Sequence, residues 1–185
     1  MRLDNYTQEA REALLDAQSW TLQLGQQVIE LEHLLAKLIE QDGGIVGPLL
    51  DKIGVEPALL AQELDRLIKA LPKVSGSQPY LGPKLNQALE RAQHHADQLK
   101  DDYISTEHLF LAACDDGAQV GDALRKKGIT PAVVLQALED IRGSHRVTDE
   151  NPENRYQALS RYARDLTAEA RKGKIDPVVG RDDEI

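Results

Sequence analysis

The chain has 185 residues, which is enough for one domain of ordinary size with a short extension. Its formal net charge of −9 argues against a nucleic-acid-binding protein, because such proteins need a basic face. Hydrophobic residues make up 41% of the chain and aromatic residues only 4%, so the core must consist mostly of aliphatic side chains and alanine, which favours helices.

The single cysteine, Cys114, cannot form an intrachain disulfide, which fits a reducing compartment. No stretch of the sequence has the apolar length of a membrane span, and the N-terminus lacks the apolar region of a signal peptide. We therefore expect a cytoplasmic protein without a membrane partner.

From the N-terminus, apolar residues at helical spacing between Tyr6 and Leu24 predict a first helix. A second helix follows the Glu32-His33 pair. A short third helix is expected to end at Gly54, and a fourth to open at Pro57, where proline is tolerated because that N–H has no helical partner. The next stretch, 71–83, is rich in proline and glycine and predicts a connection.

The same plan then repeats. Ile29, Glu32, His33 and Leu34 recur 75 residues later as Ile104, Glu107, His108 and Leu109, and many flanking residues are identical in the same register after a single gap. This is an internal duplication. The fold class is predicted to be all-α, with about eight helices in two pseudo-repeats of about four each, at about 3–70 and 82–142, and no convincing strand.

The folded unit is thus expected to span residues 1–142. The stretch 143–155 is polar and without hydrophobic period, so we expect a flexible linker. Residues 156–185 return to helical spacing and are expected to begin another module.

The two Glu-His pairs have a structural and a chemical interpretation. Ser105 is well placed to cap the helix that starts beside Glu107, and His108 could hydrogen-bond back to the preceding loop. A zinc hydrolase needs two histidines four residues apart with a glutamate between them, and here only one histidine stands in each copy. The structural interpretation is favoured, and a small metal-dependent hydrolase stays a remote alternative.

The duplicated Ile-x-x-Glu-His-Leu and Gly-(Val/Ile)-x-Pro motifs resemble the N-terminal domain of the Clp/Hsp100 ATPases. The segment "ALSRYARDLTAEARKGKIDPVVGRDDEI", 158–185, resembles the entry into the first AAA+ domain of that family. The start "MRLDNYT" and the Tyr-x-Arg-Asp-Leu-Thr form favour the disaggregase branch of the family over its protease-coupled branch.

The resemblance implies a substrate-engaging module that binds exposed apolar segments of unfolded or aggregated proteins. The alternative is an adaptor-docking domain of a protease-coupled unfoldase. In this family the polar positions that contact substrate correspond to Thr7, Asp101 and Glu107. The segment placed against the adenine of bound nucleotide corresponds to Val178, Val179, Gly180 and Arg181, in the context of the full-length protein.

The sequence contains no Gly-x-x-x-x-Gly-Lys-(Ser/Thr) loop to hold phosphates. We therefore expect this chain to be a fragment that is not an enzyme by itself and that takes no metal or other cofactor. The resemblance implies that the full-length protein is a hexameric AAA+ ATPase that uses ATP and magnesium, self-associates through its AAA+ domains and works with the Hsp70 (DnaK) system.

Overall fold

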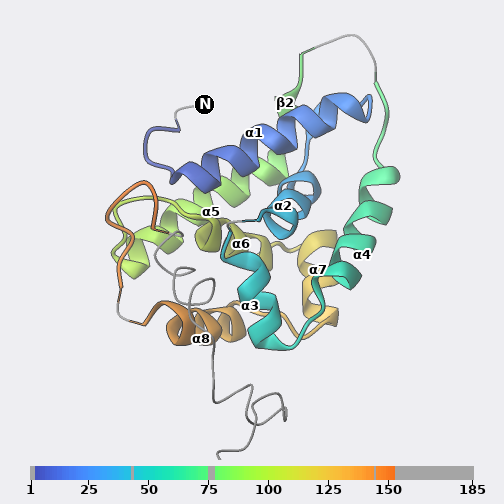
Figure 1. Ribbon diagram of the computed structural model, residues 1–185. Helices are drawn as coiled ribbons and strands as arrows, with labels where there is room; N and C mark the ends of the chain where they lie inside the picture. Colours follow the sequence, from blue (N-terminus) through green and yellow to red (C-terminus); the bar gives the residue numbers. More distant parts are fainter. Residues whose placement is uncertain (1–2, 43, 75–77, 144, 153–185) are drawn as a thin grey trace, which may run out of the picture.

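The computed structural model describes residues 3–42, 44–74, 78–143 and 145–152. This part of the chain forms eight helices and two very short strands (Figure 1). The helical fold class is confirmed, whereas the strands were not predicted. The elements in chain order are α1 (Gln8–Gln23), β1 (Val28–Ile29), α2 (Leu31–Glu40), α3 (Val46–Ile53), α4 (Pro57–Lys69), β2 (Tyr80–Leu81), α5 (Pro83–Leu99), α6 (Thr106–Cys114), α7 (Gln119–Lys126) and α8 (Pro131–Arg142).

The helix boundaries follow the local signals of the sequence. The side chain of Thr7 accepts a hydrogen bond from the amide of Ala10 and so caps α1. Pro57 and Pro131 open α4 and α8 at the first helical turn, as predicted. Gly54 ends α3 with φ of 84°, a left-handed conformation that glycine adopts without steric cost.

The two repeats are interlocked through the segments that precede their helices. In the strand pair, Ile29 of the first repeat lies opposite Leu81, just before the first helix of the second repeat. The reciprocal bridge joins Ile104 of the second repeat to Tyr6, just before α1. Both crossings are made by backbone hydrogen bonds, and a two-residue strand has no apolar alternation by which sequence could reveal it.

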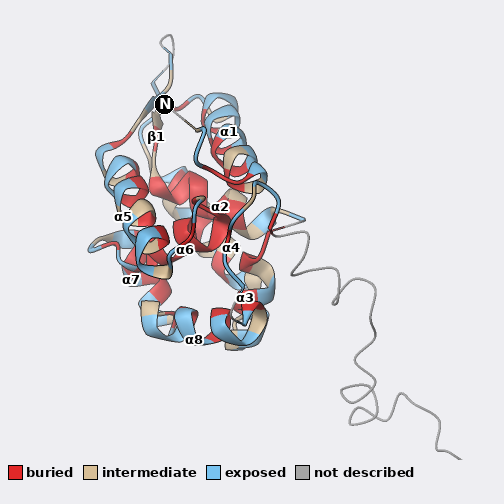
Figure 2. Cartoon of the chain, turned by 90° about the vertical axis from the view of Figure 1, so that its left-hand side faces the viewer, coloured by how far each residue is buried: buried red, intermediate tan, exposed pale blue. Residues whose placement is uncertain are grey.

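Helices α2 and α6 form the centre of the domain, and every residue of α6 is buried (Figure 2). Around them the repeats meet again in crossed pairs, because α3 contacts α8 and α4 contacts α7. An ion pair of 3.0 Å between Lys52 and Asp140 joins α3 to α8 at the surface. The core is aliphatic apart from Tyr6 and Phe110, as the low aromatic content predicted.

Residues 145–152, which we call the strap, run back from α8 along the second repeat to α1. Val147 is fully buried, and its carbonyl accepts a hydrogen bond of 2.8 Å from the amide of Asp102. Farther along, the carbonyl of Glu150 accepts one of 2.8 Å from the amide of Gln8, and its carboxylate pairs with Arg11. The strap therefore packs on the folded body, whereas the sequence predicted a flexible linker from residue 143.

The division of the rest of the chain stays a prediction, since residues 153–185 lie outside the described residues.

Candidate functional site

The two Glu-His motifs place a histidine at the third position of a central helix. The backbone N–H of Glu30 donates to Nδ1 of His33 across 3.1 Å, and that of Ser105 donates to Nδ1 of His108 across 2.9 Å. A backbone amide can only donate, so in both rings Nδ1 is the acceptor and the proton resides on Nε2. The histidines thus close the first turn of α2 and α6, a structural role that the sequence interpretation favoured.

The proton on Nε2 finds a different partner in each repeat. His33 donates to Oε1 of Gln26 across 2.7 Å, and His108 donates to Oδ2 of Asp101 across 3.0 Å. Burial lowers the pKa of His33 to about 4, so this ring is neutral near pH 7. Among the described residues, no group of three or more histidine, cysteine, aspartate or glutamate side chains could hold a metal ion.

Asp101 is the centre of a buried polar network in the second repeat. Besides His108, its carboxylate accepts hydrogen bonds from the guanidinium of Arg142 and, at 2.8 Å, from the amide of Val147. Burial raises the pKa of Asp101, but these hydrogen bonds outweigh burial, so the pKa of Asp101 lies below its ordinary value. The network ties α6, the end of α8 and the strap together.

The three predicted substrate-contacting residues are all buried. Thr7 is fully buried, caps α1 and donates its backbone N–H to the carbonyl of Ile104. Glu107 is also fully buried, and its carboxylate lies 3.5 Å from Arg142. Asp101 and Glu107 therefore meet at one arginine inside the domain and do not form an exposed acidic rim.

The predicted nucleotide-contacting residues Val178, Val179, Gly180 and Arg181 lie outside the described residues.

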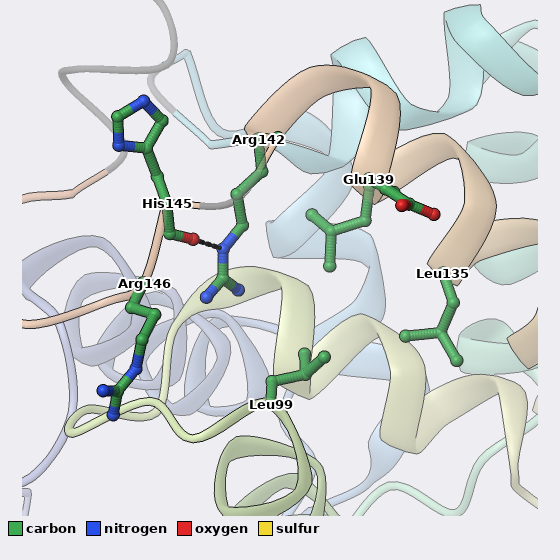
Figure 3. Close-up of a pocket in the computed structure, with 8 residues that line it drawn as sticks. Leu99, Leu135, Glu139, Arg142, His145 and Arg146 are labelled. Carbon is green, nitrogen blue, oxygen red and sulfur yellow. Dashed lines mark hydrogen bonds between the residues drawn. The ribbon is translucent and has the colours of Figure 1, made fainter.

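The same arginine lines a pocket of about 320 Å³ (Figure 3). Three leucines from α5 and α8 give it an apolar wall, while the end of α8 and the first strap residues give it a polar one. In Figure 3 the guanidinium of Arg142 points toward Leu99, and its Nε donates to the carbonyl of His145. The lining residues are Leu99, Leu135, Leu138, Glu139, Arg142, Gly143, His145 and Arg146.

The sequence did not identify this pocket, although one signal pointed to it. The apolar residues at helical spacing in α8 form a stripe of Val133, Val134, Leu138 and Ile141. Leu135 falls outside that stripe, and it is 38% exposed at the pocket wall. A leucine outside the apolar stripe of an amphipathic helix is therefore the available sign, whereas the part played by the strap had no apolar pattern to reveal it.

Two further recesses lie where the repeats meet. One, of about 460 Å³, lies between α4 and α7 and is lined mostly by charged and polar side chains. The other, of about 280 Å³, lies between α3 and α8 beside the Lys52–Asp140 ion pair. Both are more polar than the pocket at Arg142, which makes that pocket the better site for an apolar ligand.

None of the helices in the described ranges has the length and apolar character needed to cross a membrane.

Comparison with known proteins gives a consistent result. Over its whole length the chain is 42% identical to the protein named "Chaperone protein ClpB" from Nitratidesulfovibrio vulgaris, of which it covers 22%. It thus spans about a fifth of the length of the curated relatives that it matches. Among solved structures, the N-terminal domain of Hsp104 from Candida albicans superposes with a TM-score of 0.72 at 19% identity, covering 80% of this chain and 99% of that one.

The ClpV N-domain solved in complex with a VipB peptide matches with a TM-score of 0.52 at 19% identity, covering 86% of this chain and 90% of that one. These likenesses show the same fold, with its two crossed helical repeats. The family model described as "Clp repeat (R) N-terminal domain" matches residues 5–127, and the chain belongs to that family.

Proposed function

We propose that this domain engages exposed apolar segments of unfolded or aggregated proteins, and that the pocket at Arg142 takes an apolar side chain of the bound segment. The observation that supports this most is the wall of three leucines beside Arg142, whose guanidinium is held by a hydrogen bond to Asp101. The pocket, with a volume of about 320 Å³, can hold one or two aliphatic or aromatic side chains. The ClpV N-domain bound to a VipB peptide supports peptide binding as a use of this fold.

An open pocket of this size discriminates little between sequences. A hydrophobic wall distinguishes aliphatic side chains from one another only weakly, so it accepts many segments. The polar wall adds Arg146, whose side chain is half exposed and lies 3.8 Å from Asp102. We expect dissociation constants in the micromolar range, roughly −8 kcal/mol, which suits a module that must release its substrate.

In this proposal Asp101 and Glu107 act through Arg142. Asp101 holds the guanidinium by a hydrogen bond, and Glu107 faces it at 3.5 Å. Neither oxygen of the Glu107 carboxylate has a hydrogen-bond partner among the described residues, so the ion pair with Arg142 is what compensates its buried charge. Substrate contact by Thr7 stays a prediction.

For the whole protein we infer an ATP-dependent disaggregase of the Hsp100 type. The similarity to ClpB chaperones along the full chain supports this assignment over the adaptor-docking alternative. The expected ATP, magnesium, hexameric assembly and cooperation with the Hsp70 (DnaK) system belong to this inference, as does nucleotide contact by residues 178–181.

The test compares two variants of α8 that differ in which recess they line. Leu135 lines the pocket and is 38% exposed, whereas Val133 lines the α3–α8 recess and is 37% exposed. We expect Leu135→Ala to weaken binding of a permanently unfolded protein with alkylated cysteines by about tenfold. Val133→Ala should bind like the parent. Equal binding by Leu135→Ala and the parent would remove the pocket from the substrate site.

A further inference from the structure

We propose that docking of the strap and occupancy of the pocket are coupled, so that a bound substrate segment holds the strap on the domain. This inference rests on the proposed function of the pocket. It assigns to residues 145–152 a regulatory role at the same site, because their docking builds one of its walls.

The strap is fastened at points that lie outside the pocket lining. Val147 is fully buried, its amide donates to Asp101 across 2.8 Å, and its carbonyl accepts from the amide of Asp102. At the far end, Glu150 pairs with Arg11 of α1. These contacts can be broken by substitution without removing a side chain that lines the pocket.

The first strap residues are part of the pocket itself. His145 and Arg146 line it together with the leucines of α5 and α8, and the carbonyl of His145 accepts a hydrogen bond from Arg142 (Figure 3). When the strap leaves the body, this wall and one of the contacts that fix Arg142 leave with it. The undocked domain therefore presents a shallower surface with a less ordered arginine.

The consequence follows from thermodynamic linkage. For a ligand that binds only the docked form, the apparent affinity is the intrinsic affinity multiplied by the fraction of molecules in which the strap is docked. By reciprocity, saturating ligand shifts the docking equilibrium toward the docked form by the ratio of the ligand's affinities for the two forms. Substrate capture would therefore hold residues 145–152 against the domain.

The main variant places a charge where the strap is buried. Val147→Asp brings a second carboxylate beside Asp101 and should undock the strap, while Thr148→Asp adds the same charge at the neighbouring exposed position. Glu150→Lys, which faces Arg11 at the surface, weakens the far end and is not expected to disturb the core. Hydrogen exchange at the amide of Asp102 reports docking, because this amide donates to Val147.

All variants are made in the 185-residue chain and titrated with the same alkylated, unfolded protein. We expect Val147→Asp to speed exchange at Asp102 and to weaken binding about tenfold, with a smaller change in both for Glu150→Lys. Thr148→Asp should match the parent in both, and saturating ligand should slow exchange at Asp102 in the parent. If Val147→Asp does not fold, Glu150→Lys carries the comparison.

The coupling is overturned if exchange at Asp102 accelerates while binding equals that of Thr148→Asp. It is also overturned if neither Val147→Asp nor Glu150→Lys accelerates exchange, since the strap would then not be held by these contacts. Leu135→Ala distinguishes this failure from failure of the pocket. If Leu135→Ala binds more weakly than the parent while the strap variants bind like the parent, the pocket assignment stands and only the coupling is wrong. Parent-like binding by Leu135→Ala removes both.

Discussion

His108 donates its Nε2 proton to Asp101, seven residues earlier in the chain, across 3.0 Å inside the second repeat. At the equivalent place in the first repeat, His33 donates to Gln26 across 2.7 Å. In both repeats the partner of the histidine, Gln26 or Asp101, also hydrogen-bonds to the end of the fourth helix of its repeat. The geometry is shared, but the direction of the hydrogen bond is reversed: Gln26 donates to the end of its helix, whereas Asp101 accepts from the end of its helix.

The reversal follows from the two side chains. The amide nitrogen of Gln26 donates to the carbonyl of Ile68 at 2.8 Å, near the end of α4. The Asp101 carboxylate can only accept, and it receives hydrogen bonds from Arg142 at the end of α8 and from Val147 of the strap. Gln26 thus holds the end of α4 and, at 3.4 Å, the carbonyl of Leu71 just after it, whereas Asp101 holds the end of α8 and the strap.

Replacing the amide of Gln26 by a carboxylate, or the carboxylate of Asp101 by an amide, should therefore destabilise the domain. Gln26→Glu places an acceptor against the carbonyl of Ile68, and Asp101→Asn deprives the buried Arg142 of its carboxylate partner. We expect Asp101→Asn to cost about 3–5 kcal/mol of unfolding free energy. Gln26→Glu should cost about 1–3 kcal/mol. Urea denaturation followed through the single tryptophan measures both, and wild-type stability in either variant would contradict the assigned donors.

The stability of the domain should fall between pH 6.5 and 4 because of His33. Its folded-state pKa of about 4 lies below the ordinary 6.5, so the unfolded chain binds a proton in this window and the folded domain does not. The stabilisation is complete above pH 6.5 and decreases by about 3 kcal/mol as the pH falls toward 4. His33→Gln, which cannot titrate, should remove this part of the pH dependence in urea melts.

Asp101 acts in a lower pH window with the same sign. Its pKa is lowered in the folded domain, so its contribution is present above the ordinary value of 3.8 and is lost as the pH falls through the lowered value. A second loss of stability below pH 3.8 should therefore be smaller in Asp101→Asn than in the parent. An equal loss in both chains would mean that other carboxylates account for it.

Much of the fold could be predicted because the duplication doubles each local signal. Pro57 and Pro131 open equivalent helices, and Gly54 and Gly128 both adopt positive φ after equivalent ones. The strap was not predicted, because its docking depends on backbone hydrogen bonds and on one valine, Val147, within a polar stretch. Hydrophobic periodicity carries no information about such a segment.

The site was harder to predict than the fold. Asp101 lies just after the end of α5 and Glu107 is the second residue of α6, and nothing local in the sequence indicates that both are buried. Their shared partner, Arg142, is 41 residues from Asp101 and lies at the end of another helix. Contacts over that separation arise from packing of the whole repeat, so residue types and spacing could not identify them.

Cys114 should be unreactive in the folded domain. Its side chain is buried on α6, and burial raises the pKa of the thiol to about 12, so almost no thiolate exists at pH 8. A thiol-specific reagent at pH 8 should therefore modify Cys114 at the rate of domain unfolding and at full speed in urea. Rapid labelling of the native domain would show that α6 opens locally.

Gly121 should be the least replaceable glycine of the second repeat, and the first repeat supplies its control. A Cβ atom at Gly121 would lie 1.8 Å from the backbone carbonyl oxygen of Asp116, far inside van der Waals contact. That loop cannot simply move, because the carbonyl accepts from Arg125 at 3.0 Å and the Asp116 carboxylate accepts from the amide of Ala118 at 3.2 Å. We expect Gly121→Ala to cost about 3 kcal/mol or more.

The equivalent residue in the first repeat, Gly47, has nothing within 4 Å of the position of a Cβ atom apart from its own helix backbone and its chain neighbours. Gly47→Ala gains helix propensity, but an alanine before Pro48 is restricted in the helical conformation, so the two effects oppose one another. We expect its stability to stay within about 1 kcal/mol of the parent. Urea melts of both variants test the contrast, and similar costs at the two positions would show that the close approach at Asp116 does not determine the choice of glycine at Gly121.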